Sequence, residues 1–302
     1  MIKNKFTLLA GSALILLVCR VSFSEALEVT VLKGSDIKPY NEAVEGFKTT
    51  CDCNTNEFVL SEMEKGNITK SLLESKPDMI LAVGVDALKQ VKEIKNLPVV
   101  YTMVPDSSLL NEGSENISGV VMSFQPERYL STMVNMFPDA RRIGVVYNPE
   151  NTETYVKEAL QEAHSQGVEL IAEKASRPGQ VPAIIDGMKD RIDLLWMLPD
   201  ATVINSATIN YMLLFSFQNK VPIVTFSKKY VEMGAIASLN ILPFDLGAQA
   251  GEIAAKLYSE KGRRIPITAY ARKLTLAINQ KVAKKLGIKL RVKTVDRVEY
   301  VN

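Results

Sequence analysis

Residues 222–266 decide the fold of this chain, and their sequence is PIVTFSKKYVEMGAIASLNILPFDLGAQAGEIAAKLYSEKGRRIP. Two apolar runs of strand length, Pro222–Phe226 and Gly234–Leu239, flank a short amphipathic stretch. A link that contains Pro243 then leads into a long helical pattern, Phe244–Glu260, whose apolar side chains recur every three or four residues. This order predicts a strand, a helix, a second strand, a crossover, and a helix that buries one face against a sheet.

The rest of the chain alternates in the same way between short apolar runs and amphipathic stretches. We predict strands at Leu27–Leu32, Asn56–Val59, Met79–Val83, Val99–Met103, Ile117–Met122, Arg142–Tyr147, Glu169–Ala175 and Leu194–Met197. We predict helices at Tyr40–Thr49, Ile68–Glu74, Val85–Ile94, Pro126–Met136, Thr152–Gln166, Gln180–Met188 and Ala201–Lys220. Strands separated by helices predict parallel sheets with helices on both faces. Because the plan repeats, the predicted fold is α/β with two similar doubly wound lobes.

The first residues carry the features of an export signal. Two lysines precede an uncharged, mostly apolar run, Phe6–Val18, which at about 13 residues is too short to span a bilayer as a helix. Ser24 and Ala26 place small residues at the two positions that a signal peptidase reads. We therefore predict a signal peptide, residues 1–26, and a periplasmic or other extracytoplasmic location. Lipoprotein processing at Cys19 is the less favoured alternative, because a valine precedes this cysteine where a small residue is expected.

The charge balance argues against a nucleic-acid partner. The formal net charge is +2 over the whole chain and falls to zero once residues 1–26 are removed. No clustered basic face is indicated, whereas binding to phosphates needs clustered lysines and arginines. Apolar residues make up 47% of the chain, which supplies enough buried surface for two lobes.

The cysteines and the one histidine do not indicate a metal site. Only Cys51 and Cys53 remain after the predicted cleavage, separated by one residue. Their spacing is compatible with a strained disulfide and equally with two free thiols. A zinc site needs three or four ligands, and His164 lies far away in the sequence. We predict no metal ion and no cofactor.

The stretch 222–266, together with the export signal, resembles the extracytoplasmic substrate-binding proteins of ABC transporters. The resemblance is to the tryptophan- or aromatic-amino-acid-like branch of the type I periplasmic binding protein family. VVYNPEN, residues 145–151, is similar to the family's strand followed by a Tyr-Asn-Pro turn, and LPDAT, residues 198–202, is similar to its tract at the mouth of the cleft. The resemblance implies two lobes joined by a three-strand hinge that can close around a ligand.

The same resemblance implies where the lobes join. It places residues 27–121 and 241–266 in an N-terminal lobe, and residues 122–240 and 267–302 in a C-terminal lobe. Asn240 then lies at the hinge.

In an open parallel sheet, ligands bind at the carboxyl ends of the strands. Gly84 and Asp86 follow the predicted strand Met79–Val83, where a glycine lets a ligand approach the backbone. They could equally do no more than make the turn and begin the helix. Tyr40 follows the first strand and is expected to form an aromatic wall. Trp196, in the middle of a predicted strand, is assigned to the core.

Polar residues also follow the strands of the second lobe. Asn148 and Thr154 belong to the turn after one strand, and the resemblance places Thr154 where the family often has a serine that contacts ligand. Asp200 and Thr202 follow another strand. Asp200 could receive a ligand ammonium group, although an aspartate at a helix start is also a good N-cap. Phe226 ends a further strand and is expected to add to the aromatic wall.

The sequence offers little for catalysis. It has one histidine and lacks the serine-hydrolase, Walker and Rossmann glycine motifs, so we predict no catalytic residues. We expect a monomeric substrate-binding protein of an ABC importer, which captures a small ligand such as an amino acid and docks on a membrane permease. The alternative is a periplasmic sensory protein that presents its ligand to a receptor kinase or chemoreceptor. An exported enzyme on this fold would need a catalytic cluster that the sequence does not show.

Overall fold

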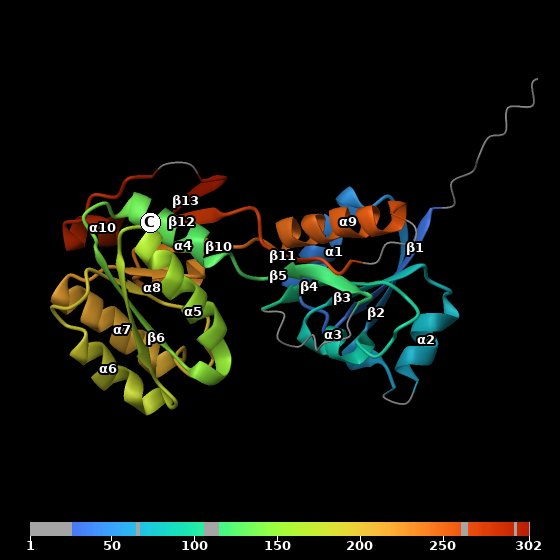
Figure 1. The fold of residues 1–302 in the computed structure, drawn as a ribbon, viewed down its shortest axis with the longest axis horizontal. Coiled ribbons are helices and arrows are strands. Elements are labelled where there is room, and N and C mark those ends of the chain that lie inside the picture. The colour runs from blue at the N-terminus through green and yellow to red at the C-terminus, as the bar shows by residue number, and fades with distance from the viewer. Residues whose placement is uncertain (1–25, 65–66, 106–114, 261–264, 293–294, 302) are drawn as a thin grey trace, which may run out of the picture.

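The computed structural model describes residues 26–64, 67–105, 115–260, 265–292 and 295–301. They form two α/β lobes that lie side by side (Figure 1). The predicted signal peptide, with Cys19, lies outside the described residues except for Ala26. None of the helices in the described part of the chain is long and apolar enough to cross a membrane.

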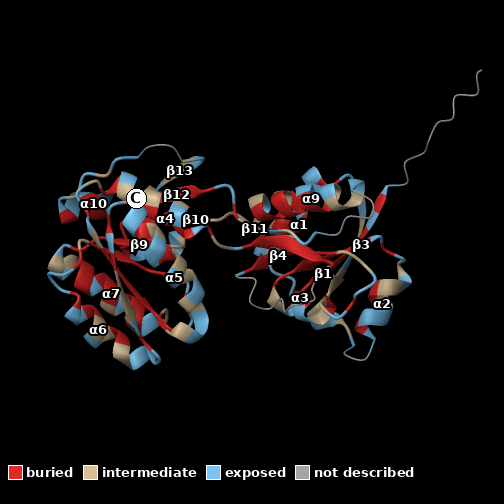
Figure 2. Cartoon of the chain, viewed as in Figure 1, coloured by how far each residue is buried: buried red, intermediate tan, exposed pale blue. Residues whose placement is uncertain are grey.

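The first lobe is built on a sheet of six parallel strands in the order β11-β5-β4-β3-β1-β2. Its strands are β1 (Leu27–Lys33), β2 (Cys53–Val59), β3 (Met79–Val83), β4 (Val99–Val104), β5 (Ile117–Val121) and β11 (Thr268–Tyr270). Alternate side chains enter opposite layers: Val29 and Val31 join one apolar cluster, whereas Leu32 joins another. The inner strands β3, β4 and β5 are therefore buried on both faces, as Figure 2 shows for β3 and β4.

Helices cover both faces of this sheet. α1 (Lys38–Thr50) and α9 (Pro243–Ser259) cover one face, and α2 (Ile68–Glu74) and α3 (Val85–Val91) cover the other, with a short 3-10 turn, Leu60–Glu62, before α2 (Figure 1). The backbones of α1 and α9 touch. A Cβ added at Gly247 would lie 1.8 Å from the Ala43 carbonyl oxygen, and one at Gly46 would lie 1.9 Å from the Phe244 carbonyl oxygen. Glycine at these positions sets the distance between the two helices.

The second lobe is built on seven strands in the order β13-β12-β10-β9-β8-β6-β7, in which β12 runs antiparallel to β10. Its strands are β6 (Arg142–Tyr147), β7 (Glu169–Lys174), β8 (Leu194–Trp196), β9 (Ile223–Thr225), β10 (Ala237–Asn240), β12 (Thr275–Asn279) and β13 (Arg297–Val301). Its helices are α4 (Pro126–Met136), α5 (Pro149–Ser165), α6 (Val181–Gly187), α7 (Ser206–Asn219), α8 (Lys228–Met233) and α10 (Gln280–Leu286), with a 3-10 turn, Pro178–Gln180, before α6. The two doubly wound sheets confirm the predicted fold class.

Three segments of the described chain connect the two sheets: β5 to α4, β10 to α9, and β11 to β12. They lie side by side, because Ala271 N donates to Ser123 O at 3.0 Å and Asn240 Nδ2 donates to Thr275 O at 3.1 Å. β5 and β11 end where two of these connections begin, and β10 ends where the third begins. The carboxyl edges of both sheets therefore point toward the connections and the space between the lobes.

One expected boundary is wrong in detail. Residues from Ile267 onward were expected in the C-terminal lobe, but β11 pairs with β5 in the first sheet. The pairing begins early, because Gly119 N donates to the Ile267 carbonyl oxygen at 2.7 Å. The chain thus crosses to the second sheet after Tyr270. The other lobe boundaries stay a prediction.

One helix begins later than its apolar pattern predicts. The expected helix Ala201–Lys220 is observed as Ser206–Asn219. Its N-cap is Asn205, whose side chain accepts hydrogen bonds from the backbone N–H groups of Ala207 and Thr208. Asp200 is therefore not the N-cap of α7, and the residues between β8 and α7 form a loop at the carboxyl edge of the second sheet.

Candidate functional site

In the first lobe, Tyr40 lies over two glycines at neighbouring strand ends. A Cβ added at Gly84, after β3, would lie 2.4 Å from Tyr40 Oη, and one at Gly34, after β1, would lie 3.6 Å from Tyr40 Cε2. Gly84 also has φ +93°, a conformation that favours glycine. The loop after β3 thus depends on glycine to admit the aromatic ring, whereas Gly34 makes only an ordinary contact with it.

The predicted residues Tyr40, Gly84 and Asp86 come together at this edge. Burial raises the pKa of the half-buried Tyr40, and the negative charge of Asp86 raises it further. Asp86 itself lies exposed in the first turn of α3. The edge therefore presents an aromatic ring beside a solvent-accessible carboxylate.

In the second lobe, Asp200 joins the loops after β6 and β8. Its side chain is only 1% exposed. Its Oδ1 accepts hydrogen bonds from Asn151 Nδ2 at 2.9 Å, Thr202 N at 2.9 Å and Val203 N at 3.2 Å, and its Oδ2 accepts from Asn148 N at 2.8 Å and Thr152 Oγ1 at 3.0 Å. With both oxygens occupied by donors of the protein, the carboxylate holds the two loops together in this arrangement.

The start of α5 is closed by similar bonds. Asn148 Oδ1 accepts a hydrogen bond from Glu150 N at 3.1 Å. The carbonyl oxygen of Asn148 accepts from the backbone N–H groups of Asn151 and Thr152. Thr202 Oγ1 accepts from Asn148 Nδ2 at 2.8 Å and from Asn151 Nδ2 at 3.1 Å. Two accepted bonds fill the oxygen lone pairs of Thr202, so its hydroxyl proton is available for donation. Asn148, Asp200 and Thr202 thus form one polar cluster.

The other predicted residues of the second lobe lie outside this cluster. Thr154 is exposed on α5. Phe226, after β9, is half-buried and makes an edge-to-face contact with Tyr230 of α8, with ring centroids 5.3 Å apart. Asn240 ends β10, next to the connection to α9, and its Nδ2 donates to the Thr275 carbonyl oxygen of β12. Its role at the hinge stays a prediction.

Sequence reasoning missed two supports of the cluster and one aromatic neighbour. Asn151 and Thr152 both donate to Asp200, and they stand three and four residues after Asn148, on the first turn of a helix. Residues at this spacing lie on the same face of a helix, so the spacing could have been used to predict that they join Asn148. Tyr230 offered none, because an aromatic residue on a short helix is equally typical of a core.

Trp196 is 1% exposed and lies in the core between two tyrosines, as expected. Its ring centroid is 4.9 Å from that of Tyr129 and 6.1 Å from that of Tyr155. Tyr129 Oη donates to Thr225 O at 2.7 Å, and Tyr155 Oη donates to Phe124 O at 3.0 Å. The tyrosines thus pack α4 and α5 against Trp196 of β8, and Tyr129 also bonds α4 to β9.

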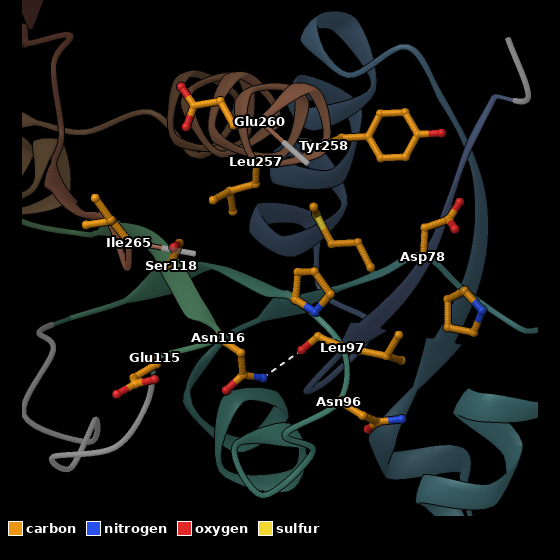
Figure 3. Close-up of a pocket in the computed structure, with 13 residues that line it drawn as sticks. Asp78, Asn96, Leu97, Glu115, Asn116, Ser118, Leu257, Tyr258, Glu260 and Ile265 are labelled. Atoms are coloured by element: carbon orange, nitrogen blue, oxygen red, sulfur yellow. Dashed lines mark hydrogen bonds between the residues drawn. The ribbon is translucent and has the colours of Figure 1, made fainter. Parts of the chain in front are cut away.

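One described cavity of the first lobe lies away from these strand ends. It measures about 290 Å³ and is lined by residues that precede β3, β4 and β5, together with the end of α9 (Figure 3). Within it, Asn116 Nδ2 donates to Leu97 O at 2.6 Å. This is the amino edge of the first sheet, whereas ligands of parallel α/β sheets bind at the carboxyl edge. We therefore locate the candidate site at the strand ends, not in this cavity.

The described residues hold no group of three or more His, Cys, Asp or Glu side chains that could bind a metal ion. The polar groups at the strand ends include hydroxyls, amides and the exposed carboxylate of Asp86. Such groups suit the orientation of a small polar ligand.

Residues 50–298 match the family described as ABC transporter substrate binding protein. The chain belongs to this family. Members of the family bind small molecules outside the cytoplasm and work with the membrane permeases of ABC transporters.

Individual relatives of this substrate-binding protein extend the comparison. It is 24% identical over 245 residues to a tyrosine-binding protein of Clostridioides difficile (strain R20291), an alignment that covers 78% of this chain and 70% of the relative. Its fold is similar to that of a substrate binding protein with adhesive properties from Clostridium difficile, in a ligand-free, open structure. The TM-score is 0.72 and the identity is 19%, and the match covers 91% of this chain and 99% of that chain. Its fold is also similar to that of an ABC domain in complex with L-Trp from Streptococcus pneumonia, with a TM-score of 0.59 and 17% identity. This match covers 91% of this chain and 100% of that chain.

Proposed function

We propose that this substrate-binding protein captures an amino acid with an aromatic side chain between its lobes, as a monomer and without chemical conversion. The observation that carries the proposal is the orientation of the two sheets. Strands of both sheets end where the connecting segments begin, so the polar strand ends of both lobes border the same space. The tyrosine-binding relative supports the choice of ligand class.

The two edges differ in a way that suits a zwitterion. The first lobe presents the exposed carboxylate of Asp86 beside the ring of Tyr40, which suits an ammonium group next to an aromatic side chain. The second lobe presents the hydroxyls of Thr202 and Thr154, which can donate to a carboxylate. Phe226 adds apolar surface at the same edge of the second sheet. Closure of the lobes then places the ligand between opposite partners.

Gly84 and Asn148 complete the proposed site as backbone and loop supports, and Asn240 ends β10 where a connecting segment that bends during closure begins. Asp200 is assigned a supporting role, because donors of the protein already occupy its carboxylate. Residues 1–26 are proposed to act as the export signal.

The test is a thermal-shift and calorimetric screen of L-tyrosine, L-tryptophan and L-phenylalanine. A ligand at 100 times its Kd stabilises the folded state by about 2.7 kcal/mol. Tyramine and the matching 3-arylpropionates, which lack the carboxylate or the ammonium group, should bind far more weakly. A shift that is equal for all three kinds of compound, or no shift with any amino acid, would overturn the proposal, as would recovery of a chemically altered ligand.

A matched pair of variants checks the location. Asp86→Asn should weaken binding of the intact amino acid by at least about tenfold. Asp78→Asn, which changes a carboxylate in the cavity at the opposite edge of the sheet, should leave binding unchanged. The reverse result would place the ligand in that cavity.

A further inference from the structure

Two free cysteines lie at the junction of α1 and β2. Cys51 follows the last residue of α1, and Cys53 is the first residue of β2. Cys51 is 3% exposed, whereas Cys53 is half-buried. Both thiols lie at the amino edge of the first sheet, away from the candidate ligand site at its carboxyl edge. Their chemistry is therefore independent of ligand binding.

The two thiols interact directly. Hydrogen bonding with Cys53 is the main cause that raises the pKa of Cys51, and hydrogen bonding with Cys51 is the cause that most lowers the pKa of Cys53. Burial, Asp52 and Glu28 oppose the lowering at Cys53, and Lys48 adds to it. Cys53 is therefore both the more accessible thiol and the one whose thiolate is favoured.

The backbone allows the two sulfurs to bond. Cys51 is extended, with φ −102° and ψ 112°. Two residues of extended chain span roughly 6.6 Å, at the upper end of the Cα separation that a disulfide tolerates. A bridge at this limit stores strain and is easily reduced. The spacing thus favours a reversible bridge over a permanent one.

We propose that Cys51 and Cys53 form a reversible thiol–disulfide pair, in which Cys53 is the attacking thiol, Cys51 is the resolving thiol, and the oxidant is a low-molecular-weight disulfide. Disulfide exchange is expected outside the cytoplasm, where members of this family work.

The exchange takes two balanced steps. The Cys53 thiolate attacks one sulfur of the small disulfide, the sulfur–sulfur bond of that molecule breaks, and one small thiolate leaves and takes a proton. Cys51 then loses its proton to solvent and attacks the Cys53 sulfur, which releases the second small thiolate to be protonated. The protein loses two electrons and two protons, and the small disulfide is reduced to two thiols.

The bridge would form beside the contact between α1 and α9. Thr50, the residue before Cys51, donates from Oγ1 to the Ala248 carbonyl oxygen at 2.6 Å. A Cβ added at Gly251 would lie 3.3 Å from Cys51 N. Because the end of α1 is held this closely, oxidation that pulls Cys51 toward Cys53 should change protein stability measurably.

The test treats the purified native protein with oxidised glutathione, blocks remaining thiols with N-ethylmaleimide, and maps the peptide 49–65 by mass spectrometry. Trypsin releases both cysteines in this peptide, since it cleaves after Lys48 and Lys65. The wild-type peptide should lose two hydrogens and both maleimide sites, and dithiothreitol should restore them. A peptide that stays fully alkylated, or a disulfide between two protein molecules, would overturn the proposal.

Two variants test the roles of the thiols. Cys51→Ser should trap glutathione on Cys53, because the resolving thiol is missing. Cys53→Ser should stay unmodified while the protein is folded, with Cys51 alkylated at least about tenfold more slowly than Cys53 in the other variant. Equal reactivity of the two variants would contradict the assignment. If either variant fails to fold, the wild-type result still decides whether the reversible bridge forms.

Discussion

Tyr270 Oη donates a hydrogen bond to Glu158 Oε2 at 3.3 Å, and this bond joins β11 of the first lobe to α5 of the second. Burial raises the pKa of Tyr270, and the negative charge of Glu158 adds to the increase. The bond therefore links the lobes in the arrangement seen here, outside the three covalent connections.

Removal of this bond should make closure easier. Tyr270→Phe loses a hydrogen bond worth about 1 kcal/mol in this arrangement, which corresponds to roughly a fivefold gain in ligand affinity if closure breaks the bond. Calorimetry with the best amino acid from the screen measures the change. Tyr300→Phe, which removes a hydroxyl from an exposed residue of β13, serves as the control. Unchanged affinity for Tyr270→Phe would show that the bond persists on closure.

Alkaline pH should destabilise the protein through its buried tyrosines. Burial is the main cause that raises the pKa of Tyr129 and of Tyr155 above the ordinary value. A group whose pKa is raised in the folded state contributes its full stability below the unfolded pKa of about 10, and loses it as pH rises through the folded value. Urea unfolding between pH 8 and about pH 11 should show a falling free energy of unfolding. The fall should be smaller in Tyr129→Phe, and a parallel fall in both proteins would contradict this cause.

Gly84→Ala should disturb the first-lobe edge. The new Cβ would lie 2.4 Å from Tyr40 Oη on a backbone with φ +93°, so we expect a loss of about 2 kcal/mol in the free energy of unfolding. Gly179→Ala is a matched control, because nothing lies within 4 Å of its added Cβ. The double variant with Tyr40→Ala should recover part of the loss. Additive losses would show that the ring is not what the Cβ meets.

Asp200→Asn should cost stability before any ligand is added. The substitution replaces one carboxylate oxygen, which now accepts hydrogen bonds from the protein, with an NH₂ group. It also removes a buried charge that five donors surround. We therefore expect the free energy of unfolding to fall by about 3 kcal/mol. Chemical denaturation measures it. Thr154→Ala, at an exposed position on α5, should leave stability unchanged and weaken ligand binding only. If Asp200→Asn affected binding alone, Asp200 would be a direct ligand contact.

Gly247→Ala should separate α1 from α9. Its Cβ would lie 1.8 Å from the Ala43 carbonyl oxygen, which is backbone and cannot rotate away, so the expected loss is about 3 kcal/mol or more. Gly187→Ala, at the end of α6 with nothing within 4 Å, should be neutral or stabilising. Thermal unfolding of both variants checks the difference. Equal stability would mean that the helices are not held at this distance.

Local patterns in the sequence predict much of the fold. Met79–Val83, Pro126–Met136 and Arg142–Tyr147 are observed with the predicted bounds, because an apolar run or a helical stripe flanked by turn residues marks both ends. Pro126 is a further signal, since it stands at the first position of its helix.

The contacts within the candidate site could not be predicted in this way. Asp200 accepts hydrogen bonds from residues about 50 positions earlier in the chain. Tyr40, in the helix after β1, lies against Gly84, in the loop after the neighbouring strand β3. An aspartate after a strand has the same local signature whether it caps a helix, binds a ligand or holds two loops. Only the parallel pairing of β6 with β8 brings its donors within reach.

The contact between α1 and α9 also affects when the first lobe can fold during synthesis. Thr50 and Ala248 are 198 positions apart, so a ribosome that has delivered residues 27–121 has made neither α9 nor β11. The part of the first sheet's face that α9 covers then stays open to water until α9 has been synthesised, although α1 is already present on that face. Contacts this distant in sequence form late, because a long loop must close first. The lobe whose synthesis begins first thus cannot complete its core until most of the other lobe has been made.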